Sequence, residues 1–313
     1  MAALGNSDLD VFPLGLGGNT FGWTSDQEAS VAVLDGYVAG GGNFVDTADS
    51  YSAWVPGHSG GESETIIGQW VKARRNRDSI VIATKVSRHP QFRGLSAKSV
   101  LGGADASLAR LQTDYIDLYY AHYDDPDVPI EESAGAFREL QVAGKIRQVG
   151  LSNYSAPRLR EWFAVCQAAG WPLPVAFQPQ YNLVAREPYE TDFAPIVAEF
   201  GLGVLPYSAL ASGFLAGKYR TAADHAGAAR QPAAARYLTP AGLRVLAALD
   251  EVAAAHQVEP ASVAIAWLLT RPGIVAPLAS ARTVEQLGPL LAAASLRLTP
   301  EEVSALDRAS AEQ

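Results

Sequence analysis

The chain has 313 residues, of which 48% are hydrophobic and 18% are charged, so it can bury a large globular core. A formal net charge of −9 argues against general nucleic-acid binding, although it does not exclude a local basic pocket for a phosphate group. The single cysteine, Cys166, rules out an intrachain disulfide and favours a reducing, cytoplasmic environment. We expect no membrane partner, because no apolar stretch is long enough to span a bilayer and residues 1–10 lack the pattern of a signal peptide.

Short apolar runs alternate along the chain with stretches of helical periodicity. After a hairpin or first strand within residues 8–18, strands are predicted at residues 44–46, 80–85, 116–121, 146–151, 176–178, 203–207 and 274–276. Capping residues such as Ser25 and Thr283 predict helix starts between the strands, and glycines 40–42 predict a helix end. Eight strands that are nearly all followed by a helix predict an α/β fold. We expect residues 1–313 to form a single (β/α)8 TIM barrel domain with an N-terminal hairpin and extra C-terminal helices.

The segment at residues 208–238 is too long for an ordinary loop between a barrel strand and its helix. Its second half, residues 221–236, is rich in alanine with scattered charges. A surface insertion and a lid over a ligand are the two alternatives for this segment. We expect its first half to be functional and its second half to be mobile.

Polar side chains stand at the ends of three consecutive predicted strands. Asp46 and Tyr51 follow the first, Lys85 ends the second, and His122 follows the third. The C-terminal ends of parallel barrel strands meet at one rim, so we expect these side chains to meet and to carry out proton chemistry. Taken singly, each residue has a structural alternative: packing for the tyrosine, solvation for the lysine, capping for the aspartate and core burial for the histidine.

Several stretches in chain order carry a resemblance to a known family. Residues 44–51 read Phe-Val-Asp-Thr-Ala-Asp-Ser-Tyr, and further motifs follow at residues 150–154, 178–182, 206–208, 213–219 and 279–286. From about residue 14 to about residue 291 the chain resembles the aldo-keto reductase family, in the branch of bacterial reductases and potassium-channel β subunits. The resemblance implies an NADP(H)-dependent barrel that reduces an aldehyde or ketone to an alcohol, with a long loop that wraps the cofactor.

The resemblance also implies roles for the polar cluster. Tyr51 would be the general acid for carbonyl reduction, with Lys85 and Asp46 as its modulators. A phenol has a pKa near ~10 and is a poor acid at neutral pH, and a neighbouring ammonium group lowers that pKa. His122, if neutral, can donate a ring N–H to the carbonyl oxygen and orient the substrate.

The cofactor contacts that the motifs imply lie on several loops. They are Thr20, Asp46, Ser152, Asn153, Gln178, Tyr207, Ser208, Leu210, Ser212, Gly213, Lys218, Ser280, Arg282 and Gln286. A helix start after the last strand, with Ser280 and Arg282 beside it, suits a 2′-phosphate and favours NADPH over NADH. Pro289 and Leu290 depart from the family pattern, which often has a polar adenine contact there.

Aromatic side chains near the expected site are candidates for a substrate pocket. Trp23 and Trp54 lie on neighbouring loops, and Phe92 and Tyr123 are further candidates. An aromatic pocket suits apolar or aryl carbonyl compounds, whereas packing between surface loops is the structural alternative. No metal site is expected, because the five histidines are scattered and there is one cysteine.

Two other functions stay open at the level of sequence. One is an NADP(H)-binding regulatory or interaction subunit with little turnover, which could keep all four polar residues. The other is an unrelated barrel, such as an isomerase with a phosphate site after its last strands. A small-molecule carbonyl compound is the expected partner of the leading hypothesis, and a homo-oligomer is compatible with it.

Overall fold

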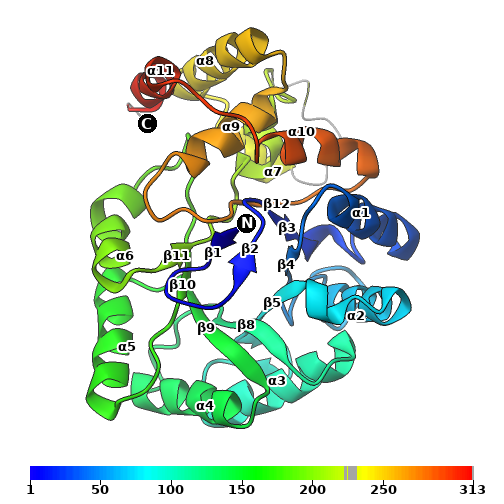
Figure 1. Cartoon of the computed structure of the whole chain (residues 1–313), viewed down its shortest axis with the longest axis vertical. Coiled ribbons are helices and arrows are strands. Elements are labelled where there is room, and N and C mark those ends of the chain that lie inside the picture. Colours follow the sequence, from blue (N-terminus) through cyan, green and yellow to red (C-terminus); the bar gives the residue numbers. More distant parts are fainter. Residues whose placement is uncertain (222–223, 225–230, 312–313) are drawn as a thin grey trace.

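The computed structural model describes residues 1–221, 224 and 231–311. Eight parallel strands form one curved sheet that encircles the centre of the view in Figure 1. In chain order they are β3 (Gly15–Gly17), β4 (Phe44–Asp46), β5 (Val81–Val86), β8 (Ile116–Ala121), β9 (Ile146–Ser152), β10 (Ala176–Gln178), β11 (Gly203–Val204) and β12 (Leu278–Ala279). The predicted (β/α)8 barrel is confirmed.

The sheet closes between β11 and the segment that leads into β12. Val275 N donates to Val204 O, and Leu278 N donates to Pro206 O, both at 2.9 Å. The last strand was predicted at residues 274–276, but only Ile274 bridges β11 there, and β12 itself begins at Leu278. Pro277 lies between them, and because proline has no N–H it interrupts the ladder.

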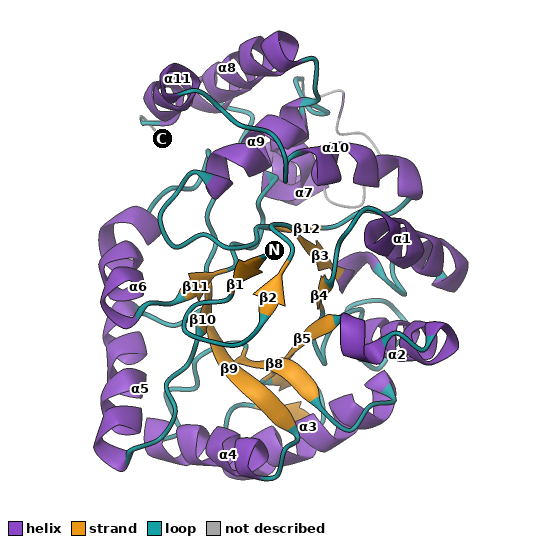
Figure 2. Cartoon of the chain, in the orientation of Figure 1, coloured by secondary structure: helices purple, strands orange, loops and turns teal. Residues whose placement is uncertain are grey.

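Helices surround the sheet on its outer side (Figure 2). They are α1 (Gln27–Ala39), α2 (Glu62–Arg74), α3 (Ala97–Leu111), α4 (Ile130–Val142), α5 (Ala156–Ala169), α6 (Ala194–Phe200), α7 (Gln231–Ala235), α8 (Pro240–His256), α9 (Pro260–Leu269), α10 (Leu287–Ala292) and α11 (Pro300–Ser310). The extra C-terminal helix α11 packs against α8 (Figure 1). Helix α1 is capped by Asp26, whose side chain accepts from Ala29 N, one residue after the predicted Ser25.

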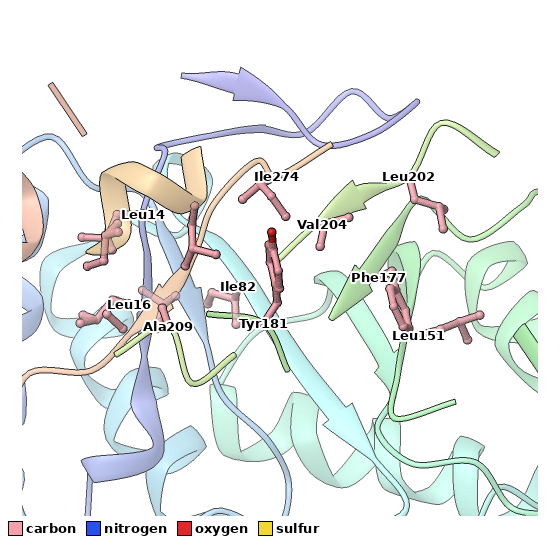
Figure 3. Packing of buried hydrophobic residues seen from close by; sticks show 14 of the residues in the cluster. Leu14, Leu16, Ile82, Leu151, Phe177, Tyr181, Leu202, Val204, Ala209 and Ile274 are labelled. Carbon is pink, nitrogen blue, oxygen red and sulfur yellow. The ribbon is translucent and has the colours of Figure 1, made fainter. Parts of the chain in front are cut away.

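Side chains alternate along the strands between two apolar layers. An outer layer lies between the sheet and the helices, and Figure 3 shows part of it, including Leu16, Ile82, Leu151 and Phe177. The inner layer fills the barrel with Phe44, Val81, Ala83, Leu118, Tyr120, Ala176, Leu205, Ala276 and Leu278. The N-terminal hairpin adds Leu4, Leu9 and Val11 to this layer. It is formed by β1 (Ala2–Ala3) and β2 (Asp10–Val11).

The hairpin lies over the centre of the barrel in Figure 1 and covers its N-terminal end. The C-terminal end of the sheet is therefore the one that is open to ligands. A second, short hairpin stands at that end, where β6 (Arg88–His89) pairs antiparallel with β7 (Phe92–Arg93) directly after β5.

Within the described residues, no single helix is both long enough and apolar enough to cross a bilayer, and only the bent pair α8 and α9 meets that test when its two helices are taken together.

Candidate active site

The predicted polar residues form the next inward-facing layer above the apolar filling of the barrel. Asp46 lies two residues after Phe44, Lys85 two after Ala83, and His122 two after Tyr120. Because strand side chains alternate with a period of two, each of these residues points inward at the C-terminal rim. The alternation of the strands therefore brings together groups that are far apart in the sequence.

Lys85 is the centre of the cluster and is fully buried. Its Nζ donates to Asp46 Oδ2 and to the Thr47 carbonyl oxygen, both at 2.6 Å, and to the Tyr51 hydroxyl at 3.0 Å. These are the three hydrogen bonds that an ammonium group can donate. The second carboxylate oxygen of Asp46 accepts from Gln178 Nε2 at 2.9 Å. The buried charges are thus paired and hydrogen-bonded, which offsets much of the cost of burying them.

Burial shapes the protonation of the cluster. Burial raises the pKa of Tyr51 above its ordinary value. The positive charge of Lys85 lowers this pKa, but it only partly offsets the effect of burial. Burial alone would lower the pKa of Lys85, but the charge of Asp46 and the hydrogen bonds to Asp46 and Tyr51 outweigh burial and raise it. We expected Lys85 to lower the pKa of the phenol, and it does so, but the net shift is upward. The phenol therefore holds its proton at neutral pH.

His122 is neutral at physiological pH. Burial, followed by the charges of Lys85 and Arg88, lowers its pKa well below the usual value for histidine. Its ring lies 6.4 Å from that of Tyr51, and Nδ1 has no hydrogen-bond partner among the described residues. A neutral ring keeps one N–H to donate, as the orienting role requires.

A cavity of about 570 Å³ opens above the cluster. Tyr51, His122, Trp54, Tyr123 and Tyr207 contribute to its wall. Trp23 does not line the cavity but supports it, because its ring meets that of Trp54 edge-on at 5.5 Å. An aromatic wall around one phenol and one imidazole can hold a flat, largely apolar molecule with its polar group directed at the cluster.

A second cavity, of about 370 Å³, continues from the first and shares Asn19 and Ser208 with it. Its lining includes nine of the residues predicted to contact the cofactor: Thr20, Ser208, Leu210, Ser212, Gly213, Lys218, Ser280, Arg282 and Gln286. Two of its walls come from opposite ends of the chain, since Ser280 Oγ donates to Asn19 Oδ1 at 2.6 Å. The two cavities form one groove that runs from the polar cluster to Arg282.

The residues predicted to contact a nicotinamide all lie in the first cavity. Ser152, Asn153, Gln178 and Tyr207 line it, and Tyr207 is followed by Ser208, which both cavities share. Asn153 Nδ2 donates to the His122 carbonyl oxygen at 2.8 Å, and its Oδ1 accepts from the Tyr207 hydroxyl at 3.0 Å. These bonds hold the amide of Asn153 and the phenol ring of Tyr207 in place, so this part of the cavity wall is preformed.

The long segment after β11 contributes its first half to this groove. Residues 211–216 form a 3-10 turn that is broken at Ser212 and Gly213, both with positive φ. Gly213 has φ of 95°, which a glycine adopts without strain. Of the second half, which we predicted to be mobile, residues 222–223 and 225–230 lie outside the described part of the chain.

Some residues lie elsewhere than we predicted. Phe92 was a pocket candidate, but it packs beside His89, with ring centroids 5.7 Å apart, and lies against Gly102 of α3. Asp46 lies beneath the cavities rather than in their walls. Several residues that we did not predict also line the groove, among them the polar Asn19 and the charged Arg88 and Arg93. Arg88 lies two residues after the end of β5, so its place just beyond the C-terminal end of a barrel strand was the available signal.

No group of three or more histidine, cysteine, aspartate or glutamate side chains in the described residues is arranged to hold a metal ion.

The geometry agrees with comparisons to known proteins. A family model described as the aldo/keto reductase family matches residues 13–311. The chain is 33% identical to norsolorinic acid reductase B of Aspergillus parasiticus, an alignment that covers 97% of this chain and 82% of the relative. It is 30% identical to protein tas of Escherichia coli, with 96% and 95% covered. A probable voltage-gated potassium channel subunit beta of Oryza sativa is 32% identical, with 97% and 94% covered. The chain therefore belongs to the aldo/keto reductase family, a family of oxidoreductases that generally bind NAD(P)H.

Proposed function

We propose that this protein reduces an aldehyde or ketone to an alcohol with NADPH. The observation that carries the proposal is the 3.0 Å hydrogen bond between Lys85 Nζ and the Tyr51 hydroxyl at the floor of an aromatic cavity. The phenol is the acid that gives up the proton. The ammonium group beside it is already in place to stabilise the phenolate that remains.

The groove beside the cavity fits a dinucleotide. At the end nearer the polar cluster, in the first cavity, Ser152, Asn153 and Gln178 offer the hydroxyl and amide groups that a carboxamide requires. At its far end, Lys218 and Arg282 are exposed cations that form no ion pair within the described residues. Positive charge there suits a phosphate group, and a guanidinium can bind a 2′-phosphate through two hydrogen bonds. When bound, the reduced cofactor supplies the hydride.

The protein's own residues handle the proton. As negative charge develops on the carbonyl oxygen, Tyr51 donates its proton to that oxygen and becomes a phenolate. The ammonium group of Lys85 stabilises the phenolate, and Asp46 holds Lys85 in position through its 2.6 Å contact. His122, which is neutral, donates a ring N–H to the same oxygen and fixes the face that the carbonyl presents. Tyr51 regains a proton from solvent before the next turnover.

Substitution of Tyr51 by phenylalanine tests this proposal. The Tyr51→Phe variant should lose at least ~100-fold in kcat across a panel of aldehydes and ketones, because the general acid is removed, while it still binds NADPH. NADPH oxidation, followed by absorbance, measures turnover, and quenching of protein fluorescence measures binding.

A matched control is Tyr115→Phe, which makes the same chemical change directly before β8, at the opposite end of the barrel. Its turnover should equal that of the unmodified protein. Full activity in Tyr51→Phe would exclude Tyr51 as the acid. Tight NADPH binding by the unmodified protein without turnover of any carbonyl compound would instead favour a regulatory or interaction subunit, and two relatives are named as probable potassium channel subunits.

A further inference from the structure

Two arginines that the carbonyl chemistry does not use line the wall of the same cavity as Tyr51 and His122. Arg88 and Arg93 belong to the short β6–β7 hairpin and are direct partners across it. Directly opposed residues of an antiparallel pair project to the same face, so the two guanidinium groups share one side of the hairpin. Like charges in this position destabilise a sheet, so the pairing has a cost that an anionic ligand would remove.

The hairpin is held firmly at the cavity rim. Gly94 N donates to Ser87 O at 3.0 Å, and Ser99 Oγ donates to the Arg93 carbonyl oxygen at 2.7 Å. On the opposite side of the hairpin, Phe92 packs against α3 and anchors it. A phenylalanine that lies outside the cavity therefore serves to position the arginines that line it.

Arg88 is also oriented by an aromatic ring. Its guanidinium carbon lies 3.9 Å from the ring centre of Tyr123, a cavity-wall residue. Stacking of this kind fixes the plane of the guanidinium while leaving its N–H groups free to bind a ligand. The charge of Arg88 also reaches the polar cluster, because it contributes to the lowered pKa of His122.

The acidic residues nearby do not neutralise this pair. Arg88 and Arg93 form no ion pair within the described residues. In the adjoining cavity, Asp124 is paired with Arg158 at 2.8 Å, and Asp125 accepts from the backbone N–H groups of Leu95 and Asp127. The side chain of Asp127 also lines that cavity, but within the described residues it forms no ion pair with either arginine. The protein as a whole carries a net charge of −9, so two unpaired cations at the rim are a local exception.

We propose that the substrate is an aryl carbonyl compound that also bears a carboxylate, and that Arg88 and Arg93 bind this carboxylate while Tyr51 and His122 bind the carbonyl oxygen. This inference rests on the proposed reductase function. The arginines are separate from the cations of the cofactor groove, since Lys218 and Arg282 line the other cavity. A planar guanidinium matches a carboxylate through two parallel hydrogen bonds, and the aromatic wall accommodates the aryl ring between the two polar ends.

Pairs of aldehydes that differ only in charge test the proposal. The 3- and 4-formylbenzoates are compared with their methyl esters, with saturating NADPH, and the ratio of kcat/KM for acid and ester is the readout. We expect the unmodified protein to favour at least one of the acids by about tenfold or more, chiefly through KM. The preference should weaken as salt is added.

The variants Arg88→Gln and Arg93→Gln should each lower the acid-to-ester ratio several-fold, and the double variant should bring it close to one. Arg75→Gln removes an exposed arginine at the end of α2 and controls for the change in net charge. Turnover of the ester and the circular dichroism spectrum show whether each variant keeps its fold and its catalytic centre.

The outcomes separate the two proposals. Equal kcat/KM for acid and ester, or an unchanged ratio in the double variant, would overturn the carboxylate subsite and leave the reductase function standing. Failure to reduce any of the four compounds or any member of the wider carbonyl panel would overturn the reductase function and this inference together.

Discussion

At the scale of single residues, the site depends on the two-residue repeat of a strand. Phe44 and Ala83 fill the barrel, and the next inward positions on the same strands are Asp46 and Lys85. A shift of either strand by one residue would turn its polar group outward, into the apolar layer beneath the helices. The apolar filling of the barrel and the polar cluster are therefore specified by the same register.

The protonation of His122 leads to a pH effect on stability. Its pKa in the folded protein is well below the ordinary 6.5, so below pH 6.5 the unfolded chain binds a proton that the folded chain does not. Stability should therefore fall as the pH drops through this range. Between pH 8 and pH 5.5, the free energy of unfolding of His122→Asn should fall by about 1 kcal/mol less than that of the unmodified protein.

Urea unfolding of both proteins at the two pH values measures the difference. The comparison cancels the contributions of all other titrating groups, because both proteins share them. Equal losses of unfolding free energy would show that the folded protein protonates His122 as readily as the unfolded chain does.

At the scale of elements, α2 and α3 approach each other closely at Gly68. A Cβ at this position would lie 2.3 Å from the Arg110 carbonyl oxygen and 2.6 Å from the Leu111 carbonyl carbon. Both are backbone atoms, which cannot rotate away as a side chain can. The glycine is thus required by the packing of two helices and not by the conformation of its own helix.

Gly68→Ala should destabilise the protein by about 2 kcal/mol through overpacking. Gly288→Ala is the matched control, because it is a helical glycine with no atom within 4 Å of the added Cβ. It should stabilise the protein by about 0.5 kcal/mol through helix propensity. Chemical denaturation measures both changes, and a neutral or stabilising effect at Gly68 would contradict the close contact of α2 with α3.

At the scale of the whole molecule, the groove joins segments from both ends of the chain. Asn19 and Thr20 follow the first barrel strand, whereas Ser280 and Arg282 follow the last, and these strands are neighbours because the sheet closes. Hydrogen bonds between Ser280 and Asn19, and between Thr20 Oγ1 and the Ala281 carbonyl oxygen, fasten the two segments together. A ligand in this groove would therefore stabilise the closure of the barrel as well as its own site.

A thermal-shift comparison tests the part of this groove that we assign to the 2′-phosphate. At a concentration 100 times its Kd, a ligand adds about 2.7 kcal/mol to stability. Arg282→Ala should weaken NADPH binding by about tenfold. This removes roughly 1.4 kcal/mol of the stability that NADPH adds and lowers the NADPH-induced rise in Tm by a few degrees. The rise induced by NADH should not change.

Arg75→Ala serves as the control for removing a surface cation, and both nucleotides should protect it as they protect the unmodified protein. Equal losses of protection by NADPH and NADH in Arg282→Ala would mean that this arginine does not recognise the 2′-phosphate.

The sequence alone determined the architecture and the identity of the four polar residues. Strand 116–121 was predicted with its observed bounds, and Asp46, Lys85 and His122 stood at strand ends because a periodic, local pattern places them there. Only the tertiary structure decided which groups face each other across the barrel. The pairing of Arg88 with Arg93, the displacement of Phe92 to the far side of their hairpin, and the upward shift in the pKa of Tyr51 all depend on through-space contacts and burial. The hairpin contacts are local and the pKa shift is long-range, but no hydrophobic periodicity along the chain encodes either of them.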